Sequence, residues 1–249
     1  MKNIDNAKKI AVLIDAENAQ YSVMGAILSE LSKHGHLAVK KAYGDWSSNH
    51  LKNWKQPLNE LAITPVQQFS YTQGKNSSDA AMIIDAMDLL YTEQFDAFAL
   101  VTSDSDFTKL ASRMKESQIY VFGVGEDKTP VAFRNACDDF ISTKILKNPE
   151  PEKEDAPKKG TKKTDGRKTK VQLRRDNKLI NILRNAVNEY AGEDEWAELG
   201  TCGSLIKRQH PDFDPRNYGY RTFTQLFEAT DLFEFNKQLH GILVKPKKK

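Results

Sequence analysis

Residues 10–18 read Ile-Ala-Val-Leu-Ile-Asp-Ala-Glu-Asn, and this stretch decides the fold. Its apolar run, residues 10–14, does not alternate with polar residues, which is typical of a parallel strand buried on both faces. The run ends at Asp15, and Asn18 follows three residues later. An acidic residue at the carboxyl end of such a strand lies where open α/β sheets place their ligands.

A second buried strand ends in the same way. Residues 97–102 are predicted as a strand, and Asp104 and Asp106 come directly after it. Further strands are predicted at residues 37–43, 64–69, 119–124 and 140–143, and helices at residues 20–34, 47–61, 77–91, 106–116 and 131–136. Strands that alternate with helices of this length predict an α/β domain with a parallel sheet and right-handed connections.

Composition excludes several classes of protein. The chain has 249 residues, enough for one large domain or two ordinary ones, and no apolar run approaches the length of a membrane-spanning helix. The first apolar run is too short for a secretory signal. Cys137 and Cys202 have no CxxC context, so neither a disulfide framework nor a zinc site is indicated. We therefore expect a cytoplasmic protein without a membrane partner.

Apolar residues almost vanish between residues 147 and 170, which predicts a flexible charged linker. The sequence thus predicts a first domain at residues 1–146 and a second at residues 171–249. Lys and Arg number 15 against 18 Asp and Glu in residues 1–146, but 22 against 16 in residues 147–249. This asymmetry suggests a polyanionic partner held mainly by the second half, although ordinary solubility charge explains it equally well.

The second domain is predicted to be a small winged helix-turn-helix. An amphipathic helix is expected at residues 173–190, and residues 196–206 are expected to form a short helix, a turn and the start of another helix. A further helix passes through Phe223 and Phe227, and residues 232–235 and 241–244 are expected to pair as a terminal hairpin.

Four carboxylates are expected to meet at one edge of the first domain. If the strands that end at Asp15 and before Asp104 and Asp106 are neighbours, these side chains come together, and Asp79 joins them from the start of helix 77–91. Two carboxylates about 6 Å apart repel by roughly 3 kcal/mol at an effective dielectric constant near 20. All four are therefore candidate ligands of Mg²⁺ or Mn²⁺, which prefer carboxylate oxygens.

Each of these acids also has a structural explanation. Asp79 lies in the first turn of a helix, where the helix dipole favours an acid. Either Asp104 or Asp106 could cap the helix that follows the strand, but capping does not explain the two residues together. Asp85 lies on a different face of helix 77–91 from Asp79, so we interpret it as structural.

The first domain contains five motifs that resemble those of a known family. The motifs that carry the resemblance are Ile-Asp-Ala-Glu-Asn at 14–18, Tyr-Gly-Asp-Trp at 43–46, Lys75 ahead of Asp79, Thr-Ser-Asp-Ser-Asp-Phe at 102–107 and Cys-Asp-Asp-Phe at 137–140. Together, over about residues 8–146, they resemble the NYN domain of the PIN-like nuclease superfamily. The resemblance implies a sheet of order 3-2-1-4-5 and an Mg²⁺- or Mn²⁺-dependent ribonuclease, most simply an endonuclease.

The resemblance also assigns roles to residues. Catalytic roles fall on Asp15, Asn18, Asp79, Asp104 and Asp106. Secondary roles fall on Asp45, Lys75, Ser103 and Asp138, of which Asp138 has a turn as its structural explanation.

The second domain resembles the LOTUS, or OST-HTH, domain over about residues 172–246. The motifs are Trp-Ala-Glu-Leu at 196–199, Gly-Ser-Leu-Ile-Lys at 203–207, the stretch His210 to Arg221, and Asp-Leu-Phe-Glu-Phe at 231–235. The resemblance implies a winged-helix module that binds RNA. The candidate RNA-binding residues are Lys207, Arg208, Arg216 and Arg221.

The sequence therefore predicts a metal-dependent hydrolase of RNA phosphodiester bonds with a C-terminal RNA-binding module. The main alternative is a non-catalytic RNA-binding regulator whose acidic site only binds metal or is degenerate. A haloacid-dehalogenase-like phosphatase would need Asp where Glu17 stands, and a dinucleotide-binding domain would need a Gly-rich turn after the first strand. RNA is the expected partner, while a protein partner of the second domain and a homodimer are left open.

Overall fold

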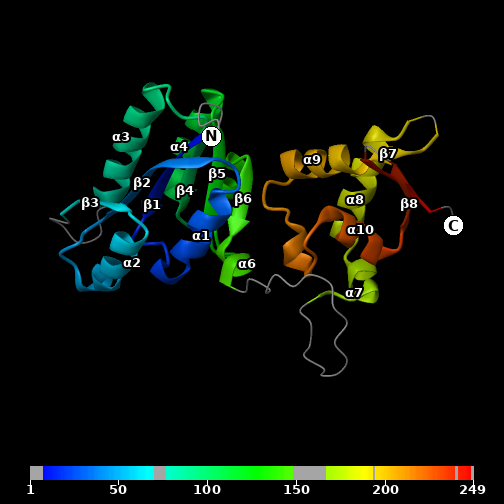
Figure 1. The fold of residues 1–249 in the computed structure, drawn as a ribbon, viewed down its shortest axis with the longest axis horizontal. Helices are drawn as coiled ribbons and strands as arrows, with labels where there is room; N and C mark the ends of the chain where they lie inside the picture. Colours follow the sequence, from blue (N-terminus) through cyan, green and yellow to red (C-terminus); the bar gives the residue numbers. More distant parts are fainter. Residues whose placement is uncertain (1–7, 70–76, 148–166, 193, 239–240, 248–249) are drawn as a thin grey trace, which may run out of the picture. The chain divides into compact units, whose positions relative to one another are not determined.

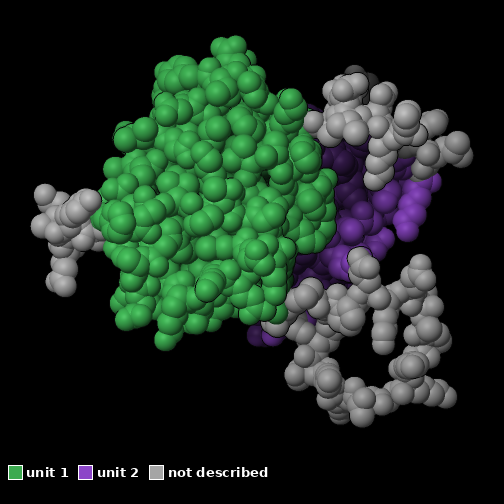
Figure 2. All heavy atoms as spheres, turned by 60° about the vertical axis from the view of Figure 1, so that its left-hand side comes forward, with its two compact units in different colours: residues 1–149 green, residues 150–249 purple. Residues whose placement is uncertain are grey.

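The computed structural model describes residues 8–69, 77–147, 167–192, 194–238 and 241–247. The chain forms two compact units, Met1–Pro149 and Glu150–Lys249, which are coloured separately in Figure 2. Each unit has its own hydrophobic core. Among the described residues, no helix combines the length and the apolarity needed to cross a bilayer.

Unit 1 is built on a six-stranded parallel sheet of order β3-β2-β1-β4-β5-β6 (Figure 1). Its strands are β1 (Lys9–Asp15), β2 (His36–Gly44), β3 (Thr64–Gln67), β4 (Ala97–Val101), β5 (Tyr120–Gly125) and β6 (Asp139–Ser142). The predicted α/β class and the order 3-2-1-4-5 are confirmed, and β6 extends the sheet beside β5.

Helices cover both faces of this sheet, as the continuous apolar strands require. Its helices are η2 (Tyr21–Val23), α1 (Met24–Leu31), η3 (Asn49–Trp54), α2 (Lys55–Glu60), α3 (Ser77–Tyr91), η4 (Ser105–Phe107), α4 (Thr108–Glu116), α5 (Val131–Ala136) and α6 (Thr143–Lys147). One core joins α1, η3 and α6 to the β1 residues Ile10, Val12 and Ile14. The other joins α3, α4 and α5 to Ala11 and Leu13, so alternate β1 residues supply the two cores.

The predicted elements of unit 1 differ from the observed ones mainly at their ends. The predicted helix 47–61 is divided into η3 and α2, and Ser48 accepts a hydrogen bond from the backbone N–H of His50 at the start of η3. Helix α6 was not predicted, because it is a short segment that leads directly out of β6.

The described residues of unit 2 form four α-helices, one 3-10 helix and a three-stranded antiparallel sheet of order β7-β9-β8. Its elements are α7 (Lys170–Arg175), α8 (Asn177–Tyr190), β7 (Ala197–Glu198), α9 (Leu199–Gln209), η5 (Pro215–Tyr218), α10 (Phe223–Thr230), β8 (Phe233–Gln238) and β9 (Gly241–Pro246). The predicted terminal hairpin is β8 with β9, and β7 completes the sheet (Figure 1).

Three predictions for unit 2 need correction. The helix expected at 173–190 is interrupted at Asp176, whose backbone leaves the helical region and whose carboxylate accepts a hydrogen bond from the backbone N–H of Leu179 to start α8. Residues 197–198 form a strand, and residues 199–209 form one uninterrupted helix. Lys168, placed in the linker by the sequence, is tied to unit 2 by backbone hydrogen bonds with Tyr218 and with the Tyr220 hydroxyl.

Candidate active site

Strand geometry directs two polar residues toward the same side of the sheet. Asp15 follows Ala11 and Leu13 at intervals of two residues, and Thr102 follows Phe98 and Leu100 in the same way. Side chains two residues apart share a face, so Asp15 and Thr102 lie on the face that α3, α4 and α5 cover. Because β1 and β4 are neighbours, the two side chains meet, and the Thr102 hydroxyl donates to Asp15 Oδ2 at 2.8 Å.

Three carboxylates converge beside this pair. One oxygen each from Asp79, Asp104 and Asp106 lies within 4.8 Å of the others. Asp79 comes from the first turn of α3, and Asp104 and Asp106 come from the loop and η4 after β4. Asp104 also caps η4, since its Oδ1 accepts from the backbone N–H of Asp106 at 2.9 Å. Its capping role and its place in the cluster are therefore compatible.

The pKa of Asp79 is raised within this cluster. Asp79 is 8% exposed. Burial raises the pKa of Asp79 from 3.8 to about 6, and the negative charges of Asp15, Asp104, Glu17 and Asp106 add to the shift. The folded chain thus holds a set of carboxylates that would gain from a bound cation.

Asp15 is held differently from these three acids. It is 1% exposed, and its carboxylate accepts four hydrogen bonds. The Asn18 side chain donates to Oδ2 at 2.8 Å, and the backbone N–H groups of Glu17 and Asn18 donate to Oδ1, both at 3.2 Å. Burial raises the pKa of Asp15, while the hydrogen bonds from Asn18 and Thr102 oppose this rise. Among the described residues, the convergent group contains the other three acids and not Asp15.

Two residues of the site, Thr102 and Glu17, were not predicted from the sequence. The Thr102 hydroxyl links the ends of β1 and β4, because it donates to Asp15 and accepts from the backbone N–H of Asp104 at 3.1 Å. Glu17 accepts from the Ser78 hydroxyl at 3.1 Å and thereby ties the loop after β1 to the start of α3. Thr102 lies two residues after the buried Leu100, so the sequence could have predicted that both face the same side of the sheet. Nothing in the sequence indicated the contact between Glu17 and Ser78.

The residues with predicted secondary roles are dispersed. Asp45 follows β2 at the same edge of the sheet, where its Oδ1 accepts from Ser47 and Gln67. Ser103 accepts hydrogen bonds from the Glu126 N–H and from the Thr129 hydroxyl, which fixes the loop after β5. Lys75 lies outside the described residues.

Asp138 does not belong to this site. It precedes β6 and accepts from the backbone N–H of Val121 near the start of β5, so it lies at the opposite, amino edge of the sheet, where it pairs with Lys115 at 3.2 Å. Asp85 is structural, as the sequence indicated, because Lys41 and the Tyr43 hydroxyl bind it at 2.7 and 2.6 Å and fasten α3 to β2.

The predicted RNA-binding cations of unit 2 differ in their surroundings. Arg216 forms a bidentate ion pair with Asp214 through Nε and Nη2, and 2.7 Å separates Nη2 from Oδ2. Arg208 donates to the Tyr190 hydroxyl at 2.9 Å. Lys207 is half-buried in α9, and Arg221 is exposed just before α10.

Comparison with known families matches both units. The NYN domain profile matches residues 9–146, which is more than half of the chain, and the OST-HTH/LOTUS domain profile matches residues 174–244. A search of curated proteins finds no match.

Two solved structures are similar to the chain at low identity. A protein of unknown function from Vibrio parahaemolyticus is 18% identical with a TM-score of 0.48, and the match covers 57% of this chain and 96% of that one. MurG from Acinetobacter baumannii is 11% identical with a TM-score of 0.38, covering 87% of this chain and 66% of MurG. At these scores neither likeness carries an argument about function.

Proposed function

The chain belongs to the NYN domain family, whose members share a PIN-like nuclease domain, and we propose that it is a metal-dependent ribonuclease. The substrate would be RNA, and the reaction would be hydrolysis of its phosphodiester bonds. The observation that carries the proposal is the convergence of Asp79, Asp104 and Asp106 at the carboxyl edge of the sheet, with their oxygens within 4.8 Å of one another.

The donor set fits a hard divalent cation. All three side chains offer carboxylate oxygens, which Mg²⁺ and Mn²⁺ prefer, and the group contains no imidazole or thiolate. Burial and the charges of the neighbouring acids raise the pKa of Asp79 to about 6, so a bound cation would favour its ionised form. Asp79, Asp104 and Asp106 would therefore hold Mg²⁺ or Mn²⁺. Such an ion lowers the pKa of a bound water and offsets the charge that develops on a phosphate.

The remaining residues would position this group. Thr102 and Asn18 fix the Asp15 carboxylate, and Thr102 also holds the backbone at Asp104, so the ends of β1 and β4 keep a constant separation. Asn18 is exposed and donates to Asp15 through Nδ2, which leaves its amide oxygen as an acceptor for the attacking water. Asp15 lies beside Asp79, Asp104 and Asp106 and adds a further negative charge on the same face of the sheet.

Unit 2 would bind the same RNA outside the site. Its match to the OST-HTH/LOTUS domain and the excess of Lys and Arg in residues 147–249 both favour a polyanionic ligand. A second RNA-binding unit joined to a nuclease raises the effective concentration of substrate at the acidic site. We further propose the domain limits 1–146 and 171–249, with a linker between them that ends before Lys168, because this residue is hydrogen-bonded to Tyr218 and Tyr220 of unit 2.

The test is incubation of the full chain with a labelled RNA mixture, in Mg²⁺, in Mn²⁺ and in chelator. We expect cleavage with metal and none in chelator. Asp104→Asn should lower the rate by at least the roughly 10- to 100-fold that loss of a supporting ligand costs in other metal enzymes. Asp88→Asn is the matched control, because Asp88 is exposed on the outer side of α3.

Two outcomes would overturn the proposal. Undiminished cleavage after metal removal would exclude metal-dependent hydrolysis at this site. RNA binding without cleavage in either metal would favour the non-catalytic regulator instead.

A further inference from the structure

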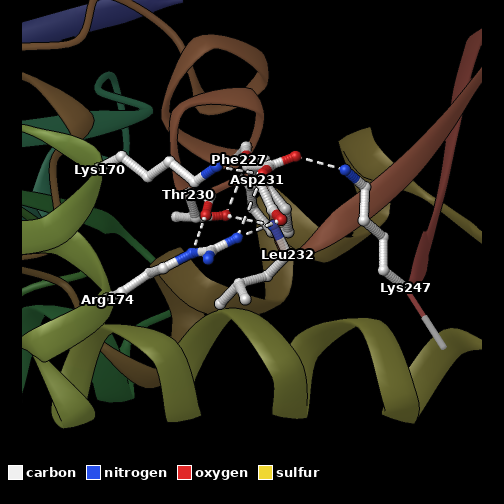
Figure 3. Close-up of polar contacts among 7 residues, drawn as sticks. All are labelled: Lys170, Arg174, Phe227, Thr230, Asp231, Leu232 and Lys247. Carbon is white, nitrogen blue, oxygen red and sulfur yellow. Dashed lines mark hydrogen bonds and ion pairs between the residues drawn. The ribbon is translucent and has the colours of Figure 1, made fainter. Parts of the chain in front are cut away.

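Three cations of unit 2 converge on one carboxylate (Figure 3). Asp231 follows the last residue of α10 with φ of 52° and ψ of 34°, and its side chain is 41% exposed. Lys170 and Arg174 reach it from α7, and Lys247 reaches it from just beyond β9. The cluster therefore joins the first helix of the unit to the end of its last strand.

Arg174 has a structural role in this cluster. Its Nε donates to the carbonyl oxygen of Thr230 at 2.8 Å, and its Nη2 donates to the carbonyl oxygen of Asp231 at 2.7 Å. These carbonyls lie at the carboxyl end of α10, where a cation satisfies unpaired acceptors and interacts favourably with the helix dipole. The contact between Arg174 and the Asp231 carboxylate, at 3.2 Å, is secondary.

Lys170 and Lys247 differ from Arg174 because their ammonium groups are bound to the carboxylate, whereas the shorter contacts of Arg174 are with the carbonyl oxygens at the end of α10. Lys170 binds Oδ2 and Lys247 binds Oδ1, and their side chains are 50% and 44% exposed. Ion pairs with this exposure contribute little to folding stability. Two ammonium groups and a guanidinium around one carboxylate carry more positive than negative charge, so the cluster keeps a positive charge that an anion can use.

The surplus continues along the chain. Residues 167–178 contain six Lys or Arg and one acid, Asp176, and four more lysines precede them at 158, 159, 162 and 163. Within the described part of this stretch, Arg175 and Lys178 are exposed. By contrast, Arg216 and Arg208, predicted from the sequence to bind RNA, contact Asp214 and the Tyr190 hydroxyl.

We propose that Lys170 and Lys247, supported by Arg174, bind a backbone phosphate of RNA, and that Asp231 occupies the place of this phosphate in the free chain. The inference rests on the proposed function only in taking RNA as the ligand. A phosphate presents anionic oxygens to ammonium groups just as the carboxylate does, but with more acceptor sites. Binding would exchange Lys–Asp contacts for Lys–phosphate contacts and release counterions from the RNA.

The first experiment measures binding of labelled oligouridylate to the full chain by fluorescence anisotropy at several salt concentrations. Chelator is present throughout, so that no metal-dependent cleavage occurs and the result does not depend on whether the chain is a nuclease. In the variant with Lys170→Gln and Lys247→Gln, we expect weaker binding and a salt slope reduced by about one for each lost phosphate contact. The variant with Arg184→Gln and Lys237→Gln removes two exposed cations of the same unit, from α8 and β8, and is the matched control, with a smaller effect on both quantities.

The second experiment uses Asp231→Asn. Asparagine tolerates the left-handed backbone at this position, so the fold should persist, and a thermal melt checks this. Removal of the competing charge should tighten binding at low salt by several-fold. An unchanged salt slope in the double Lys variant, an equal loss in the Arg184→Gln and Lys237→Gln control, or no RNA binding by the parent would each overturn the proposal. Weakened RNA binding by a stably folded Asp231→Asn variant would do so as well.

Discussion

The substitution Asp79→Asn tests the electrostatics of the acidic site most directly. Burial and the neighbouring acids raise the pKa of Asp79 from 3.8 to about 6. At about 1.4 kcal/mol per pKa unit, the ionised side chain lowers the free energy of unfolding by about 3 kcal/mol at pH values well above 6. Its favourable interaction with the start of α3 contributes only about 0.3–1 kcal/mol in the other direction.

Asparagine at this position keeps the shape of the side chain and removes its charge. We therefore expect Asp79→Asn to raise the free energy of unfolding by about 1–3 kcal/mol at pH 8 in chelator. The assay is denaturant unfolding of the full chain, repeated with Mn²⁺. Saturating metal stabilises a folded protein by about 2.7 kcal/mol at a concentration 100 times its Kd, and most of this gain should be lost in the variant. Asp88→Asn, on the exposed side of the same helix, should change stability by less than about 0.5 kcal/mol.

The pH dependence gives the sign of the effect. Between pH of about 4 and 6, the unfolded chain has lost the Asp79 proton while the folded chain still holds it. The contribution of Asp79 to stability therefore falls as pH rises through this window. Below it, Asp79 is neutral in both states, and the advantage of the variant should vanish. A variant less stable than the parent at pH 8, or an advantage equal at pH 4 and pH 8, would refute this reasoning.

Three further predictions concern the supports of the site and the organisation of the chain. Thr102→Val removes a hydroxyl that serves both Asp15 and the backbone at Asp104, so it should cost about 1–3 kcal/mol and lower cleavage. Thr102→Ser should retain both properties in the same unfolding and cleavage assays, and equal losses would contradict the role of the hydroxyl. Limited proteolysis should cut first between residues 147 and 170, where apolar residues are almost absent, and mass spectrometry of the fragments checks this. Deletion of residues 147–249 should raise KM for long RNA much more than it lowers kcat. This increase in KM should become smaller as the salt concentration rises. An unchanged KM would indicate that unit 2 binds something other than RNA.

The architecture of unit 1 could be read from its local patterns. A continuous apolar run such as residues 10–14 is compatible with few environments other than a strand covered on both faces, and each such run is followed by a helical pattern. The carboxyl ends of parallel strands share one edge, so Asp15, Asp104 and Asp106 could be assigned to that edge before any coordinates were known. These predictions succeed because burial and chain direction are properties of short segments.

Tertiary structure decided how the acids differ from one another. In the sequence, Asp15 and Asp79 are two equivalent carboxylates of one cluster, but Asp15 is surrounded by four donors while Asp79 faces other acids. Asp138 follows the same acidic pattern and lies at the opposite edge, because it precedes a strand and does not follow one.

The same division holds for unit 2. Its content of basic residues is a property of the sequence. The tertiary fold decides which of them have acidic partners: Arg216 pairs with Asp214, and Lys170 and Lys247 meet Asp231 from opposite ends of the unit. Local pattern determines which face or edge of an element a residue occupies. The partners that set its charge and its availability come from distant segments, and only the folded chain brings them together.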